Sequence, residues 1–380
     1  MQKLNLIKQE FDHLLKVHYL NSASKAIPPK SVQKAYHSFM DDYVELYGDK
    51  VKERFQPIIR EAREQLAKLI NAKPSEIGFV KNTSEGIGII ANGYPFKHGD
   101  NIILTENEHP ANKNVWVKLQ KQGLEIRFIP TVNRTIRTSD IEAAIDDNTV
   151  ALGIASVHYT TGLRNDLSAI GQICKTKDIL LIVDAIQSVG RLELDVKADN
   201  IDYLSCGGHK GLLGTYGVGF IYCNSELIKK IIPPFSAHQS ASLIEENGIY
   251  KLKWLEDARR IEGGNMNYAG IAAINAGAKL INELGLANIE SHIVKLEKEF
   301  VNTIKGLPYV MRIPDKPVKR SGIVCIEYPA NLKSKLQHIF HKRKIYVTFN
   351  LNYFRVSFSF FNSSEDVKVI VKAMKDALEF

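Results

Sequence analysis

The sequence has no uninterrupted apolar stretch close to the ~20 residues that a helix needs to span a bilayer, so no membrane segment is expected. Its amino-terminal residues mix charges into their apolar positions and therefore lack the continuous apolar core of a secretory signal. There are only four cysteines, and their spacing matches neither a disulfide framework nor a zinc site. We expect reduced thiols, a cytoplasmic location and no bound metal.

Internal repeats and low-complexity tracts are also absent. The net charge is +8, which raises the question of a nucleic-acid partner, but acidic residues are dispersed among the basic ones. Nucleic-acid binding is therefore not expected. A length of 380 residues exceeds the ~250–300 at which single cores stop growing, so the chain is expected to form two domains.

Short apolar runs alternate with amphipathic stretches between residues 76 and 223, a pattern typical of βαβ units. The runs are IGFV, NIILT, EIRFI, VALGIASV, ILLIVDA, DYLSC and GVGFIYC. They predict an α/β fold with a mostly parallel sheet in a large domain of residues 17–275. Residues 276–380, with 1–16, are expected to form a smaller α+β domain. Ligands of such sheets gather at the carboxyl ends of the strands.

Two polar residues follow strands of this predicted sheet. Asp184 ends a run too apolar for an exposed edge, so its carboxylate is expected to be buried and to need a cationic partner, such as a protonated ligand nitrogen. A helix-capping Asp is the alternative. Lys210 lies among glycines that match neither a P-loop nor GxGxxG. A desolvated lysine there can form an imine with a carbonyl cofactor, whereas a phosphate-binding or solvated lysine is the simpler reading.

Two further segments place polar groups after strands. Thr83 and Ser84 stand between a strand and a helix, where backbone N–H groups and hydroxyls form an anion site, although an ordinary N-cap explains one hydroxyl equally well. His109 follows another strand and could lie on an aromatic ligand or transfer a proton. A structural histidine is the alternative.

The order of TSEG, ENEHPAN, VDAIQSVG and GGHKG resembles the class V aminotransferase family of fold-type I pyridoxal-phosphate enzymes. This family includes cysteine desulfurases and isopenicillin-epimerase-like proteins. The resemblance covers nearly the whole chain, from YLNSASKAIPP to FRVSFSFFNSSEDV. It implies pyridoxal 5′-phosphate as cofactor and a homodimer.

The resemblance also implies roles for single residues. Lys210 matches the Schiff-base lysine, Asp184 the partner of the pyridine nitrogen and His109 the stacked imidazole. The other matches are Gln187 for the phenolic oxygen, Thr83, Ser84 and His209 for the phosphate, Asn265 for the phosphate across the dimer interface, Arg355 for the substrate carboxylate, and Asn21 and Tyr159 for the active-site wall. The implied substrate is a small α-amino acid, bound as an external aldimine and losing its α-proton before transamination, β-elimination, racemisation or sulfur transfer.

One departure bears on the reaction. The window RKIYVTFNLNYFRV before the arginine lacks the cysteine that one branch of cysteine desulfurases uses, and Cys325 and Cys206 are expected to be buried. Transamination or cleavage of a carbon–sulfur bond is therefore favoured over a cysteine desulfurase with another thiol, and over a non-catalytic cofactor-binding module. Substrate choice is expected in the segment FSAHQSASLIEENGIYKLKW, where His238, Gln239 and Trp254 would line the entrance.

Overall fold

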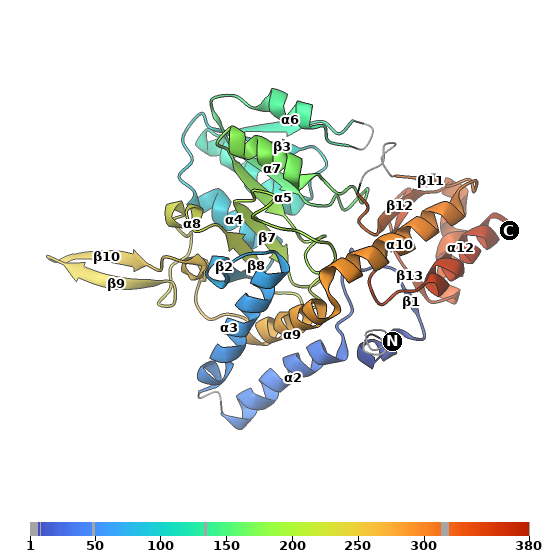
Figure 1. Ribbon diagram of the computed structural model, residues 1–380, viewed down its shortest axis with the longest axis horizontal. Coiled ribbons are helices and arrows are strands. Elements are labelled where there is room, and N and C mark those ends of the chain that lie inside the picture. Colours follow the sequence, from blue (N-terminus) through green and yellow to red (C-terminus); the bar gives the residue numbers. More distant parts are fainter. Residues whose placement is uncertain (1–6, 8, 48–49, 133–134, 313–318, 380) are drawn as a thin grey trace.

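A seven-stranded sheet forms the centre of the protein in a computed structural model that describes residues 7, 9–47, 50–132, 135–312 and 319–379 (Figure 1). The strand order is β2-β8-β7-β6-β5-β3-β4. The strands are β2 (Ile77–Val80), β3 (Asn101–Thr105), β4 (Glu125–Ile129), β5 (Thr149–Ala155), β6 (Leu180–Asp184), β7 (Tyr203–Gly207) and β8 (Gly219–Cys223). All neighbours are parallel except those of β8, which is antiparallel to both β2 and β7. The predicted mostly parallel α/β sheet is confirmed.

Most strands of this sheet are buried on both faces, which explains why they are mainly apolar. The edge strand β4 is the exception, with Glu125 and Phe128 exposed. In β6, by contrast, Leu181 and Val183 point into one apolar core and Ile182 into the other. Helices α4 (Thr83–Gly93), α5 (Pro110–Val117) and α8 (Leu227–Lys230) contribute to the core that contains Ile182. The opposite core receives α3 (Val51–Leu69), α6 (Thr138–Ala144), α7 (Leu167–Thr176) and α9 (Tyr268–Leu284), and α2 (Lys30–Glu45) packs on α9.

A second, antiparallel sheet lies towards the carboxyl end of the chain, in the order β11-β12-β15-β14. Its strands are β11 (Val310–Met311), β12 (Ile323–Glu327), β14 (Thr348–Phe349) and β15 (Tyr353–Ser357), and its helices are α10 (Leu286–Ile304), α11 (Lys333–Lys342) and α12 (Ser364–Glu379). Gly285, at φ +82°, separates α9 from α10, which crosses towards this sheet (Figure 1). Strand β1 (His18–Tyr19) pairs with β13 (Ile345–Tyr346), so the start of the chain lies beside this carboxyl-terminal part.

A β-hairpin projects from the molecule on the side away from the second sheet (Figure 1). It consists of β9 (Ala241–Glu246) and β10 (Ile249–Trp254), joined at Asn247 and Gly248, whose φ angles of 55° and 76° suit a tight turn. The segment expected to be an entrance loop is thus mainly this hairpin. Among the helices of the described residues, none is both long enough and apolar enough to cross a bilayer.

Candidate active site

A pocket of about 400 Å³ lies at the carboxyl ends of β3, β5 and β6, and residues of the second sheet form part of its lining. Most of the side chains singled out in the sequence line this one pocket. They are Thr83, Ser84, His109, Tyr159, Asp184, Gln187, His209, Lys210 and Arg355. The topology therefore brings together residues that lie more than 250 positions apart in the chain.

Asp184 is the last residue of β6 and is buried. Its Oδ1 accepts a hydrogen bond from the Ile186 amide at 3.0 Å, within a series of turns rather than at the start of a helix. Burial raises the pKa of Asp184 to about 6, and within the described residues no lysine or arginine forms an ion pair with it. A carboxylate in this position is stabilised by a cation brought by a ligand.

Lys210 follows β7 in a loop that presses against the turn after Asp184. A Cβ atom at Gly211 would lie 2.0 Å from the carbonyl oxygen of Val189, so only glycine permits this approach. Burial lowers the pKa of Lys210 to about 8, opposed by the negative charge of Asp184 and reinforced by Arg355. The amine therefore loses its proton at a much lower pH than an ordinary lysine, as a nucleophilic amine requires.

His109 forms the N-cap of α5, where its Nδ1 atom accepts a hydrogen bond from the Ala111 amide at 3.1 Å. Its ring meets that of Tyr159 edge to face, with 4.9 Å between the centroids. Burial, and then the charges of Lys210 and Arg355, lower the pKa of His109. The imidazole is therefore neutral near pH 7, which suits contact with an aromatic ligand.

The start of α4 provides one end of the pocket. Asn82, rather than Thr83 or Ser84, is the N-cap and accepts from the Glu85 amide at 2.9 Å. The Thr83 hydroxyl accepts from the Gly207 amide at 3.1 Å, while Ser84 is exposed. The His209 ring lies 4.7 Å from that of Tyr216, and burial lowers its pKa to about 4. The helix start and the Ser84 hydroxyl thus remain available for an anion.

Gln187 and Arg355 each keep one buried polar atom without a partner among the described residues, Oε1 of Gln187 and Nε of Arg355. The Gln187 amide nitrogen donates to the Ala23 carbonyl at 3.0 Å, and Nη1 of Arg355 donates to the Tyr159 carbonyl at 3.0 Å. Buried polar atoms are normally paired. A ligand with hydrogen-bonding groups and a carboxylate therefore fits the wall between them, and pyridoxal phosphate with an amino acid meets that requirement.

Comparison with known proteins identifies the family of this chain. The family model described as Aminotransferase class-V matches residues 18–370. The chain belongs to this family. A probable cysteine desulfurase of Methanothermobacter thermautotrophicus is 31% identical over 84% of this chain and 77% of its own length. The solved structure of a Thermococcus onnurineus cysteine desulfurase has a TM-score of 0.90 at 27% identity, over 99% of this chain and 98% of its own.

Another solved structure, of the cystine C–S lyase C-DES with its product cysteine persulfide, has a TM-score of 0.88 at 22% identity. It covers 97% of this chain and 99% of its own, and at that identity it shows the fold alone. The class-V protein described here is thus an enzyme of fold-type I that depends on pyridoxal 5′-phosphate.

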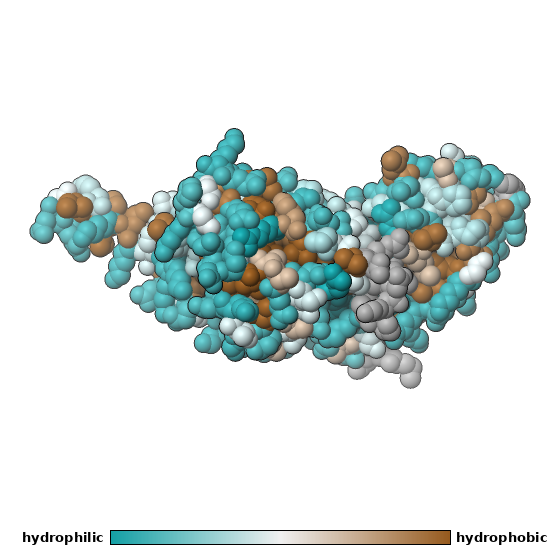
Figure 2. All heavy atoms as spheres, turned by 90° about the horizontal axis from the view of Figure 1, so that it is seen from above, coloured by the Kyte–Doolittle hydropathy of each residue, from teal (hydrophilic) through white to brown (hydrophobic). Residues whose placement is uncertain are grey.

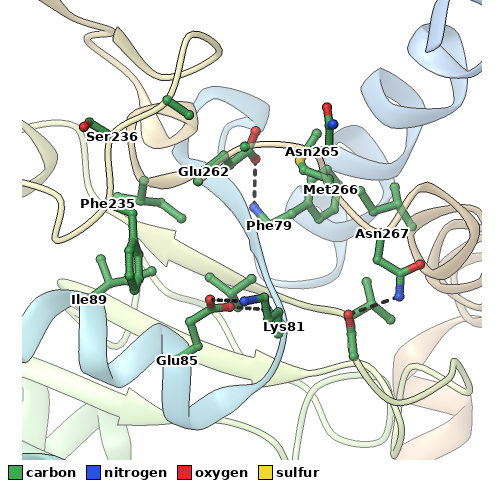
Figure 3. Close-up of a pocket in the computed structure, with 18 residues that line it drawn as sticks. Phe79, Lys81, Glu85, Ile89, Phe235, Ser236, Glu262, Asn265, Met266 and Asn267 are labelled. Atoms are coloured by element: carbon green, nitrogen blue, oxygen red, sulfur yellow. Dashed lines mark hydrogen bonds and ion pairs between the residues drawn. The ribbon is translucent and has the colours of Figure 1, made fainter.

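Asn21 and Asn265, which the family resemblance matched to the site, do not line the class-V pocket. The Asn21 amide oxygen accepts from the Thr348 hydroxyl at 2.6 Å, and Thr348 lines the cavity whereas Asn21 does not. Asn265 lines a separate pocket of about 670 Å³, which Phe235, Met266 and Asn267 also line (Figure 3). His238, Gln239 and Trp254 are not among the residues that line the Lys210 pocket within this chain, and their place at its entrance stays a prediction.

Some lining residues were missed in the sequence. Tyr353 precedes Arg355 by two positions on β15, and the period of a strand places both on one face. That alternation could have identified Tyr353. His158 lines the pocket as well, and the buried Glu108 lies 3.9 Å from its ring. Glu108 could have been noticed as an ionisable residue directly before His109.

All four cysteine thiols are buried and unpaired. Cys325 of β12 lies opposite Arg355 of β15, but it does not line the pocket. Burial raises the pKa of Cys325 to about 12. Burial also raises the pKa of Cys206 far above that of a free thiol. The expected burial of these two cysteines is confirmed.

Proposed function

We propose that this class-V enzyme acts on a small α-amino acid and either transaminates it or cleaves a carbon–sulfur bond at its β-carbon, releasing the sulfur without storing it on a cysteine. One observation carries the proposal: Lys210, Asp184 and Arg355 share a pocket that no thiol reaches. Relatives named as cysteine desulfurases support a sulfur-containing amino acid as substrate.

The cofactor end of the pocket suits these steps. Bound pyridoxal phosphate supplies an electron sink that makes the α-proton of an amino acid acidic. Asp184 would hold a proton on the pyridine nitrogen, because a buried carboxylate favours a cationic neighbour. Lys210 would hold the cofactor as an imine and then, as a free amine, carry the α-proton. His109 would lie on the ring.

The remaining proposed contacts fix orientation. Gln187 would meet the phenolic oxygen, and Thr83, Ser84 and His209 would hold the phosphate at the start of α4. Arg355 would bind the substrate carboxylate, for which a planar guanidinium is well shaped. A pocket of about 400 Å³ has to hold both cofactor and substrate, which favours a short side chain.

A panel of amino acids tests the proposal, with cofactor absorbance recorded and products identified. Pyruvate with free sulfide from cysteine supports C–S cleavage, and a keto acid with pyridoxamine phosphate supports transamination. The Lys210→Ala protein should be colourless and should lack cofactor that borohydride can fix, whereas Lys81→Ala, with an exposed lysine outside the Lys210 pocket, should behave like the wild type.

The names of the relatives favour a second candidate, a cysteine desulfurase that uses one of the four thiols after a movement of the chain. Persulfide on the protein after incubation with cysteine would identify it. A third outcome is absorbance that no amino acid changes, which would leave a cofactor-binding module without turnover.

We also propose a homodimer in the cytoplasm. Unpaired thiols suit a reducing compartment. For the dimer, the support is the hairpin, since two isolated strands with one apolar face are marginally stable alone. Leu243, Tyr250 and Leu252 point to that face and are 65%, 66% and 45% exposed, and Figure 2 shows hydrophobic surface on the projecting hairpin. Asn265 would then reach the phosphate bound by the partner.

A further inference from the structure

Glu108 is a buried carboxyl group in the turn that carries His109. Its side chain is fully buried and accepts three hydrogen bonds. Oε1 accepts from the Thr105 hydroxyl at 2.8 Å and from the Ala155 amide at 3.1 Å. Oε2 accepts from the Asn112 amide group at 2.9 Å. Thr105 ends β3 and Asn112 lies in α5, so the carboxyl ties together both ends of the turn around His109.

The bond from the Ala155 amide connects this turn to the other side of the site. Pairing between β3 and β5 ends at Leu104 and Gly153, and the Ala155 amide donates to Glu108 instead. On its other side, Ala155 is paired with Asp184 of β6. One carboxyl group therefore links the segment that carries His109 to the strand beside Asp184.

No cation of the described residues offsets the charge of Glu108 by direct contact. His158 faces it from the segment after β5, with Nε2 at 3.9 Å from Oε1 and no hydrogen-bond partner, and burial lowers the pKa of His158 to about 4, so its ring is neutral. Lys113 of α5 acts only through its more distant charge, and burial raises the pKa of Glu108. An apolar residue of similar size would cost less to bury. Packing alone does not explain a carboxyl group here.

We propose that Glu108 is a positioning residue, which fixes His109 relative to Asp184 and so aligns the groups at the face and the edge of the cofactor ring. The inference rests on the roles proposed for His109 and Asp184. Glu108 itself contacts neither cofactor nor substrate. It affects the reaction only by positioning His109 relative to Asp184.

Two substitutions separate positioning from folding. Glu108→Ala removes all three bonds. Glu108→Gln can keep them. The Asn112 Oδ1 atom has no partner within the described ranges, so this amide can turn over and accept from the new side-chain amide. As a control, Glu76→Ala removes a buried carboxyl that binds the Lys73 amide and the Ser225 hydroxyl, outside the pocket.

In the cofactor-loaded enzyme, Glu108→Ala should lower kcat about tenfold or more and leave KM within about threefold, since displaced catalytic groups slow the reacting step. Glu108→Gln should stay within about threefold of the wild type in both constants. Glu76→Ala should lower the unfolding temperature without changing kcat. NMR of protein with isotope-labelled histidine rings should show a shifted His109 signal in Glu108→Ala only, with the signal assigned from its loss in His109→Gln.

A folded Glu108→Ala protein with unchanged kcat and an unchanged His109 signal would overturn the proposal. If this variant does not fold, Thr105→Val removes one donor while keeping shape, and it should still shift the His109 signal and lower kcat by a few-fold; no effect there would equally overturn it. The NMR comparison can be made without cofactor. A wild type that binds no cofactor would therefore refute the proposed function while leaving the placement of His109 testable.

Discussion

Burial changes the proton affinities of Asp184 and Lys210 in opposite directions, and both changes favour the uncharged form. The pKa of Asp184 rises to about 6 and that of Lys210 falls to about 8. In the cofactor-free protein these two groups are therefore costly to keep charged. A ligand that brings a protonated ring nitrogen and takes up the amine relieves both costs, which links stability to cofactor binding.

The loss of folding stability that results from burying the charged Asp184 carboxylate can be measured as a function of pH. Because its pKa is raised on folding, its penalty is absent below about pH 4, grows as the pH rises towards 6 and is constant above that. Asp184→Asn should therefore stabilise the cofactor-free protein at pH 7.5 by up to about 3 kcal/mol and have little effect at pH 4. Urea unfolding at the two pH values measures this.

The exposed Asp147→Asn serves as the control and should be neutral at both pH values. The same Asp184→Asn substitution should weaken cofactor binding, since the neutral amide cannot pair with a protonated nitrogen. An equal gain in stability at pH 4 and pH 7.5 would mean that the charge of Asp184 is not what burial penalises.

Arg355 provides a second measurement at the scale of single residues. Its Nη1 atom donates to the Tyr159 carbonyl, and its Nε atom has no partner in the part of the chain that the structure describes. Lysine keeps the charge but loses the planar fork. Arg355→Lys should raise KM for an amino acid roughly 10- to 100-fold, as expected for loss of about 1.5–3 kcal/mol from a charge-assisted pair.

The matched control is the amide of the same amino acid, which lacks the carboxylate. Wild type and Arg355→Lys should process this amide equally poorly. If the substitution instead weakened the amide and the acid by the same factor, Arg355 would be acting on something other than the substrate carboxylate.

At the scale of elements, the hairpin β9–β10 is where a partner should be detectable. Leu243 of β9 pairs with Leu252 of β10, and both side chains are exposed. Leu243→Lys places a charge at the centre of this face and should shift a dimer towards monomers, measured by sedimentation velocity. Ser242→Lys, on the opposite face of the same strand, should leave the assembly unchanged. Equal effects of the two would exclude the apolar face as the contact.

The elements also show what the sequence could and could not predict. The seven apolar runs correspond to β2–β8, because strands buried on both faces need mainly apolar residues, and only the edge strand β4 is partly exposed. The hairpin was missed because neither of its faces joins a core, although Asn247 and Gly248 are a strong turn signal. Periodicity reports burial within one chain, so an element that is exposed in that chain gives little signal.

At the scale of the whole molecule, the site depends on topology that local sequence does not contain. Order along the chain suggested that Thr83, His109, Asp184 and Lys210 meet, because parallel strands end at one edge. It could not show that Thr348 lines the cavity in place of Asn21, or that Asn265 lines a different pocket. Those positions depend on how the second sheet and the loop before α9 pack.

The four thiols lie in different parts of the fold, and their reactivity can be predicted from their burial. Cys174, Cys206, Cys223 and Cys325 lie in different elements, yet all are buried, and burial raises the pKa of each. A thiol reacts as the thiolate, so none should react readily in the native enzyme. With an aromatic disulfide reagent at pH 8, we expect almost no native reaction and release of four equivalents after unfolding. A single fast thiol, lost together with protein-bound persulfide when that cysteine is replaced by serine, would instead establish sulfur transfer through the protein and contradict release of free sulfide.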